Sequence, residues 1–229
     1  MTARNPDWRR RLSYWGPRLA PCLLFLAAHY SMPHLENRIE KYGATFQLLN
    51  DTAELYRVVT HVFIHIDDDH LFKNSVGYLL ALMRWPQGSD LVSFYGVFWG
   101  GALSGLLATH VEQRYRRTQM EDKYGLGFSV VKRAVGHVHK AVMDRVPFCG
   151  SSAAVFALLS YTAVLGDRRD LTATWRRLDI LQVALLVAPE VGAMYHVPKS
   201  DVWSVERRVV GHWAHLGAIA FGLLAGVLE

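Results

Sequence analysis

The sequence predicts an all-α, multi-pass membrane protein whose core is a bundle of six transmembrane helices. Three runs, 91–111, 146–166 and 209–228, contain no Asp, Glu, Lys or Arg. Each run is about 20 residues long, the length that a helix needs to cross the roughly 30 Å hydrocarbon layer of a bilayer. A soluble domain can bury one such run as a core helix, but three together favour membrane spans.

Three further apolar segments complete the predicted bundle. They cover about 19–35, 70–85 and 178–197, and each contains only a few polar or charged residues. The chain therefore divides into a basic N-terminal tail over 1–18 and a six-helix membrane domain over 19–229. A long polar and amphipathic insertion at about 111–147 separates the third span from the fourth.

Basic residues flank the predicted spans. The tail holds Arg4, Arg9, Arg10, Arg11 and Arg18, and the connection after the fourth span holds Arg168, Arg169, Arg176 and Arg177. With four spans between them, both groups lie on one side, which the positive-inside tendency assigns to the cytoplasm or its equivalent. The alternative for the tail is an organelle-targeting segment, so the mitochondrial inner membrane and a secretory-pathway membrane both stay open. The net charge of +5 is scattered between apolar runs, which disfavours a nucleic-acid surface.

The insertion has a helical pattern of its own. Its apolar residues recur at spacings of three and four, with basic residues between them: Phe128, Val131, Val135, Val138 and Val142. We expect a basic amphipathic helix that lies on the membrane surface or on the body of the protein. The alternative is a solvated, charged loop. A role in substrate access is a hypothesis for this segment.

Polar groups inside a bilayer are costly, so those within the predicted spans are candidates for function. Gly150-Ser151-Ser152-Ala153 opens the fourth span, where the free N–H groups of a helix N-terminus can stabilise an anion. In the sixth span, His215 shares a helix face with Ala218, Gly222 and Gly226, which are small enough for close helix packing. Ordinary packing is the alternative explanation for both motifs.

A third polar set lies at the start of the second span. His70 and Asn74 are four residues apart, so they share one helix face, and both side chains can donate hydrogen bonds. The three sets together supply a serine nucleophile, a histidine base and donors for an oxyanion. No acid lies beside His215 in the sequence, so a two-member Ser–His arrangement is favoured over a triad.

The histidines before the second span raise a different possibility, a metal site. His61, His65 and one aspartate could be its ligands. However, Asp67, Asp68 and Asp69 are consecutive, so regular structure cannot point all three at one ion. They directly precede the second span, where the helix dipole favours acidic residues. We therefore predict no metal site here.

The order and placement of these motifs resemble those of rhomboid intramembrane serine proteases. His70-Leu71-Phe72-Lys73-Asn74 is similar to the family's His-x-x-x-Asn, Gly150-Ser151-Ser152-Ala153 to its Gly-x-Ser-x, and Ala214-His215 to its sixth-span motif. Tyr56-Arg57, Thr60, Phe63 and His65 resemble the tract before its second span. Together these motifs extend over nearly the whole chain.

The resemblance implies that Ser152 is the nucleophile and His215 the general base. Asn74, His70 and the Ser152 N–H would hold the oxyanion, and the supporting residues are Gly150, Phe156, Ala218 and Gly222. The implied partners are the lipid bilayer and the transmembrane substrate proteins that are cut there, with no cofactor. The rival expectation is an inactive rhomboid-like protein that binds membrane helices for chaperoning, degradation or import. The oligomeric state stays open.

Three features depart from the family's pattern. Ala153 and Ala218 each add a methyl group where glycine is common. The 111–147 insertion is longer than the connection in compact members, and Arg84-Trp85-Pro86 occupies the place of a frequent glutamate. The added methyl groups would either tighten or splay the dyad.

Overall fold

The structure, a computed structural model, describes residues 8–32, 34–49, 51–86, 88–124, 137, 149–165, 181–189, 191 and 212–229. The helices are α1 (Trp8–Ser31), α2 (Leu35–Tyr42), α3 (Phe46–Leu49), η1 (Thr52–Glu54), α4 (Arg57–Thr60), η2 (His61–Phe63), α5 (Asp68–Met83), α6 (Leu91–Tyr124), α8 (Ser152–Leu165) and α10 (His212–Leu228). Residues 181–189 are also helical. These residues contain helices and no strand, so the all-α prediction is confirmed for them.

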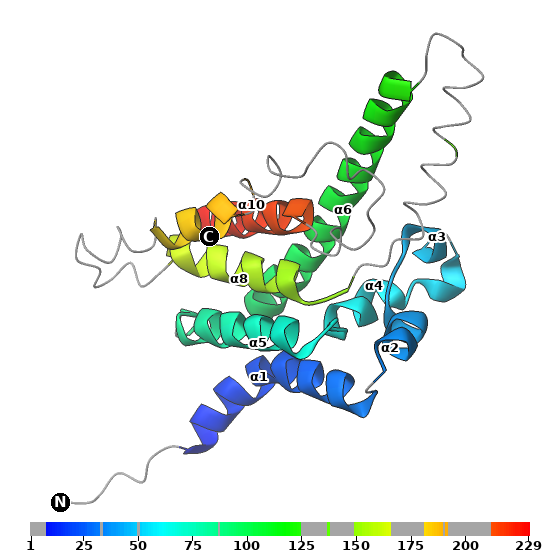
Figure 1. Cartoon of the computed structure of the whole chain (residues 1–229). Helices are drawn as coiled ribbons and strands as arrows, with labels where there is room; N and C mark the ends of the chain where they lie inside the picture. The colour runs from blue at the N-terminus through cyan, green and yellow to red at the C-terminus, as the bar shows by residue number, and fades with distance from the viewer. Residues whose placement is uncertain are drawn as a thin grey trace, which may run out of the picture.

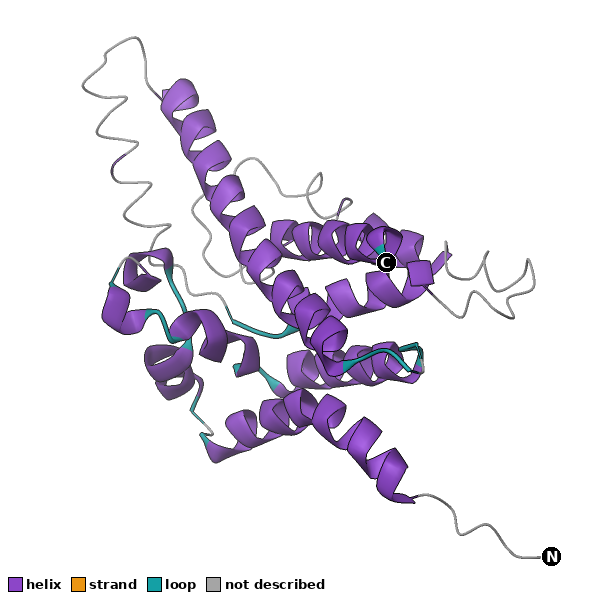
Figure 2. Ribbon diagram, turned by 180° about the vertical axis from the view of Figure 1, so that it is seen from behind, coloured by secondary structure: helices purple, strands orange, loops and turns teal. Residues whose placement is uncertain are grey.

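The bundle is centred on α8. Helices α5, α8 and α10 lie side by side, α6 crosses them, and α1 packs against α5 (Figures 1 and 2). The residues of α8 are apolar or small around its whole circumference, and eight of its fourteen are buried. A helix with this character belongs inside a bundle, which explains how the first residue of α8 comes to lie among three other helices.

Small residues set the distances between these helices. A side chain at Gly101 of α6 would collide with Ala157 of α8, and one at Gly222 of α10 would collide with the Ala157 carbonyl. Gly217 is likewise closed off by Ala108 of α6. Close backbone approach through small residues is typical of helix packing in membranes, and it lets short side chains near the helix ends reach across the bundle.

The N-terminal helix begins earlier than the sequence predicts. α1 starts at Trp8, inside the predicted basic tail, and Arg18 is buried instead of solvated. The Arg18 guanidinium donates a hydrogen bond to the Ser89 carbonyl (2.6 Å) and lies 4.0 Å from the centre of the Tyr14 ring. This arginine therefore ties α1 to the connection between α5 and α6.

Two prolines, Pro17 and Pro21, lie inside α1. Pro21 has no N–H, so the Pro17 carbonyl one turn earlier loses its helical partner. Tyr95 of α6 donates its hydroxyl to that carbonyl at 2.6 Å, and Tyr78 of α5 donates to the carbonyl of Arg18. Tyr95 thus satisfies the carbonyl that Pro21 leaves without a helical partner, and Tyr78 attaches the neighbouring residue of α1 to α5.

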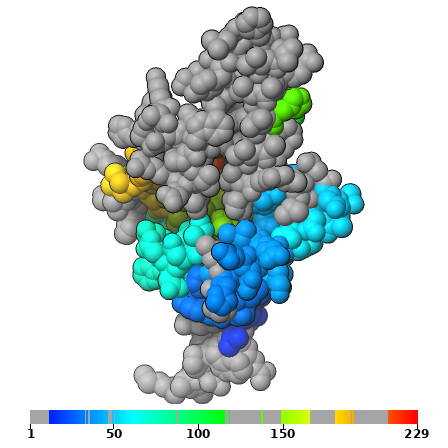
Figure 3. All heavy atoms as spheres, turned by 45° about the vertical axis from the view of Figure 1, so that its right-hand side comes forward, coloured from blue at the N-terminus to red at the C-terminus, as the bar shows by residue number. Residues whose placement is uncertain are grey.

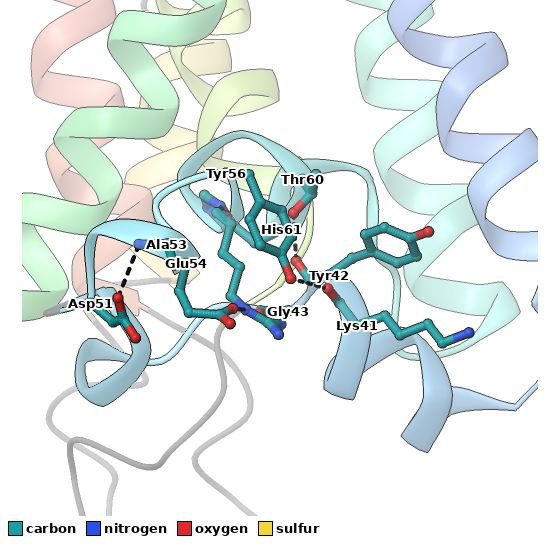
Figure 4. A network of polar contacts seen from close by, with 10 residues as sticks. Lys41, Tyr42, Gly43, Asp51, Ala53, Glu54, Tyr56, Thr60 and His61 are labelled. Carbon is teal, nitrogen blue, oxygen red and sulfur yellow. Dashed lines mark hydrogen bonds and ion pairs between the residues drawn. The ribbon is translucent and has the colours of Figure 1, made fainter.

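A compact connection of short helices joins α1 to α5. The buried Arg57 donates to the Gly43 carbonyl (2.8 Å) and pairs with Glu54. Thr60 and Tyr56 donate to the carbonyls of residues 42 and 41, each at 2.9 Å, and Figure 4 shows these contacts converging on α4. In the view of Figure 3, α1, this connection and α5 form one continuous surface. The network fixes the segment that carries His61 and His65.

The outer surface of several helices is apolar. Large hydrophobic side chains are exposed on α1 and α5, among them Leu23, Leu24, Leu26, Tyr30, Phe72, Leu79, Leu80 and Met83. So many exposed apolar side chains on two helices that pack together are unusual for a soluble protein and mark a surface that something covers. A bilayer is the simplest cover for helices arranged in this way.

Several predicted boundaries differ from the structure. Among the described residues, the Leu91–Tyr115 part of α6 is long and apolar enough to cross a membrane by length and composition, whereas the apolar helices Ser152–Leu165 and His212–Leu228 are shorter. α6 then continues to Tyr124, through the start of the predicted insertion. The amphipathic helix expected over 128–142 lies outside the described residues except for residue 137. The count of six spans stays a prediction.

Candidate active site

Ser152 and His215 come together across the contact between α8 and α10. The Ser152 Oγ lies 2.8 Å from the His215 Nε2. Ser152 is the first residue of α8, and His215 lies one turn inside α10 with its side chain buried. The Phe156 ring stacks on the imidazole with ring centres 4.4 Å apart and planes 17° apart, so it restrains the orientation of the His215 side chain.

The face that carries His215 packs as the spacing suggests. Ala218, Gly222 and Gly226 are buried along α10. Gly226 lies against Val164 and the Tyr161 carbonyl of α8, where an added Cβ would be 2.9 and 3.2 Å away. The small residues therefore hold α10 against α8 along the same face that presents the imidazole to Ser152.

The turn before Ser152 needs a glycine. Gly150 has a φ of +105°, a conformation that L side chains rarely adopt. A Cβ there would also lie 2.6 Å from the His70 Cε1. The Gly150 N–H donates to the His61 carbonyl at 2.9 Å, so the turn is attached to the connection before α5.

The predicted oxyanion donors lie on α5. His70 lies in the first turn of α5, three residues after the N-cap Asp67. The Asp67 carboxylate accepts a hydrogen bond from the His70 backbone N–H at 2.7 Å. The His70 ring lies against Gly150, which brings α5 next to the start of α8. Asn74, one turn later, is buried, and within the described part of the chain its Nδ2 has no hydrogen-bond partner. An unsatisfied buried donor is costly and is expected where a ligand oxygen binds.

Comparison with known proteins identifies the fold family. The family model for the Rhomboid domain matches residues 52–229. The chain belongs to the rhomboid family. Rhomboid proteins are embedded in the membrane, and the family acts on transmembrane substrates within the bilayer. A search of curated proteins and a search of solved structures each returned no match.

The rhomboid assignment confirms the resemblance drawn from the motifs, and the structure explains one departure from the family's pattern. The Ala153 methyl points at Gly105 of α6, where an added Cβ would be only 2.6 Å from it. Gly105 therefore provides the space that the methyl group at 153 occupies. Ala218, on α10, is fully buried.

The three consecutive aspartates of this rhomboid chain have three different partners. Asp67 caps α5, Asp68 lies 2.8 Å from the His29 Nε2, and Asp69 pairs with Lys73 at 2.5 Å. In the part of the chain that the structure describes, no three His, Cys, Asp or Glu side chains are placed to hold a metal ion. These acids instead link α5 to its own first turns and to α1.

His61 and His65 are buried next to the turn that precedes Ser152. Burial lowers the pKa of His61 to about 4 and that of His65 to about 3, so both rings are neutral at neutral pH. The His65 Nε2 lies 3.2 Å from the Ser151 Oγ. Sequence reasoning missed this contact, because its two residues are 86 positions apart and no spacing rule connects them.

Proposed function

We propose that this rhomboid protein is an intramembrane serine protease that cuts transmembrane helices of substrate proteins. The observation that carries the proposal is the 2.8 Å contact between the Ser152 Oγ and the His215 Nε2. A serine becomes a competent nucleophile when a base at hydrogen-bond distance can take its proton. The polytopic bundle that we propose has six spans and lies in a mitochondrial inner membrane or a secretory-pathway membrane.

The proposed reaction has two halves. The Ser152 Oγ attacks the scissile carbonyl while the His215 Nε2 takes the hydroxyl proton, and the same imidazole then protonates the leaving amine. A water molecule next attacks the acyl-enzyme, gives its proton to His215, and releases the carboxyl product as Ser152 regains its proton. General base catalysis of this kind is typically worth about 10²–10⁴ in rate.

The negative charge of the tetrahedral intermediate needs donors. The Ser152 backbone N–H, the His70 side chain and the Asn74 Nδ2 are our candidates. The unpartnered, buried Nδ2 of Asn74 supports this role, and so does the packing of His70 on Gly150. Loss of one oxyanion donor commonly costs about 10²–10³ in kcat.

The rival function is that of an inactive rhomboid-like protein that binds membrane helices without cutting them. Such a protein has no need of a serine hydroxyl at hydrogen-bond distance from an oriented imidazole. The stacked Phe156 ring adds to the argument, because it restrains the base in the plane that faces Ser152. We therefore favour catalysis.

Cleavage of a transmembrane reporter by the purified protein tests the proposal. We expect wild type to cut and both Ser152→Ala and His215→Ala to lose cleavage. Ser160→Ala, a buried serine two turns along α8, and His212→Ala, one turn before His215 on α10, are matched controls that should still cut. Cleavage that survives loss of Ser152 and His215 refutes the mechanism. Absence of cleavage by wild type on a broad reporter panel favours the binding protein.

A further inference from the structure

A second serine–histidine contact lies beside the Ser152–His215 pair. The Ser151 Oγ is 3.2 Å from the His65 Nε2, and both residues are completely buried, with 0% of their surface exposed. Neither side chain is open to a substrate, so this contact is not a second nucleophile with its base. It touches the turn that carries Ser152 and therefore calls for a different explanation.

Ser151 occupies the N-cap position of α8. Its carbonyl accepts from the Val155 N–H at 2.9 Å, and the helix begins at the next residue. An N-cap serine hydroxyl ordinarily accepts from the N–H of the second or third helical residue, here Ala153 or Ala154. Among the described residues, the hydrogen-bond partner of the Ser151 Oγ is His65 instead. The first amides of α8 are thus left uncapped by this side chain.

Uncapped amides at a helix N-terminus favour an anion. In the proposed reaction, the oxyanion forms beside the Ser152 N–H, at the same end of α8. A hydroxyl that capped Ala153 or Ala154 would place an oxygen lone pair next to the developing negative charge. It would also satisfy part of the positive end of the helix dipole before the substrate arrives.

His65 is well placed to hold the Ser151 hydroxyl elsewhere. Its ring is packed between Phe25 and His70, with ring centres 5.3 and 5.2 Å away. Because burial keeps its pKa far below neutrality, the ring offers one donor and one acceptor without adding charge beside the site. Either tautomer can therefore bond the hydroxyl.

We propose that His65 is a positioning residue that holds the Ser151 hydroxyl away from the Ala153 and Ala154 amides, so that no capping oxygen weakens the positive end of α8 where the oxyanion forms beside the Ser152 N–H. This inference rests on the proposed protease function. It predicts that the Ser151 hydroxyl becomes harmful once His65 cannot bond it, and that removal of the hydroxyl then restores activity.

Four variants of the full-length protein test the inference by reporter cleavage. His65→Phe keeps a buried ring but loses the hydrogen bond to the Ser151 hydroxyl. We expect kcat to fall about tenfold or more, up to the loss that follows removal of one oxyanion donor. KM should change little. Ser151→Ala should keep most of the wild-type kcat. The double variant His65→Phe/Ser151→Ala should recover most of the rate that His65→Phe loses. His65→Gln, which can still bond the hydroxyl, should resemble wild type.

A purely structural role for His65 predicts a different pattern. The double variant would then be as slow as His65→Phe or slower, and that result overturns the inference. An equal loss of kcat in Ser151→Ala and in His65→Phe also overturns the inference. Ser151→Ala removes only one oxygen atom, so it is the variant less prone to misfolding.

Backbone amide exchange of Ala153 and Ala154, followed by NMR in micelles, gives a readout that does not need cleavage. We expect slower exchange in His65→Phe and a return to wild-type exchange in the double variant, whereas unchanged exchange in His65→Phe contradicts the inference. The proposed protease function fails independently of this inference if wild type shows no cleavage that depends on Ser152. The exchange measurement alone then decides whether His65 controls the cap.

Discussion

At the scale of single residues, three histidines hold the turn that precedes Ser152. The His61 carbonyl accepts from Gly150, the His65 ring contacts Ser151, and the His70 ring lies against Gly150. The sequence predicted the partnership of Ser152 with His215 by resemblance to rhomboid motifs. It could not predict what His61 and His65 touch, because contacts between a loop and a distant turn leave no periodic pattern in either segment.

Gly150→Ala tests the geometry of this turn. The substitution forces an L side chain into a φ of +105° and drives a methyl group into the His70 ring. We expect cleavage to fall by about 10² or more, comparable to the loss of an oxyanion donor. Reporter cleavage and thermal unfolding measure the effect.

Gly88→Ala is the matched control for that variant. Gly88 has a similar φ of +97° but lies in the turn between α5 and α6, with open space around its Cα. This variant carries the backbone strain of about 1–2 kcal/mol and should cut like wild type. Equal losses of activity in the two variants would mean that strain, and not the contact with His70, governs the site.

At the scale of helices, hydrophobicity predicted where helices lie better than where they end. α8 and α10 fall within the predicted runs 146–166 and 209–228. α1 and α6 extend further, because charged residues end an apolar run without ending a helix. Arginine, glutamate and glutamine are good helix formers, so α6 runs on to Tyr124 through the polar sequence after Val111. An apolar run therefore predicts which part of a helix can lie in a bilayer, whereas helix propensity predicts how far the helix continues beyond that part.

Gly222→Ala tests how the packing of α10 on α8 supports the dyad. The new methyl group would collide with the Ala157 carbonyl, so the two helices must separate. We expect a destabilisation of about 1–3 kcal/mol, typical of overpacking, together with slower cleavage because His215 moves away from Ser152. Gly96→Ala on α6, where nothing lies within 4 Å, is the control and should be neutral or slightly stabilising. A Gly222→Ala protein with wild-type stability and rate would show that the contact is not limiting.

At the scale of the whole molecule, the connection between α1 and α5 acts as a second support for the bundle. It buries Arg57, His61 and His65, and it reaches the turn before Ser152 through the 2.9 Å bond from the Gly150 N–H to the His61 carbonyl. Its polar groups are satisfied internally, as Arg57 is by Gly43 and Glu54, and only the folded chain shows such pairing. The stability of this part of the molecule should therefore depend on keeping its histidines neutral.

Stability should accordingly fall as the pH is lowered through the range in which free histidine titrates. In the unfolded chain, imidazoles bind protons near pH 6.5, whereas burial holds the pKa of His61 at about 4 and that of His65 at about 3 in the folded protein. Between these values the unfolded state therefore binds more protons than the folded state. The contribution of the two neutral histidines to the free energy of unfolding is complete above about pH 6.5. It is lost as the pH falls toward about 4 for His61 and about 3 for His65. Each histidine contributes a slope of up to about 1.4 kcal/mol per pH unit. Thermal unfolding in micelles at several pH values measures this slope. His65→Phe should reduce the slope by roughly the contribution of one histidine. An unchanged slope in that variant would show that the fold does not hold His65 neutral.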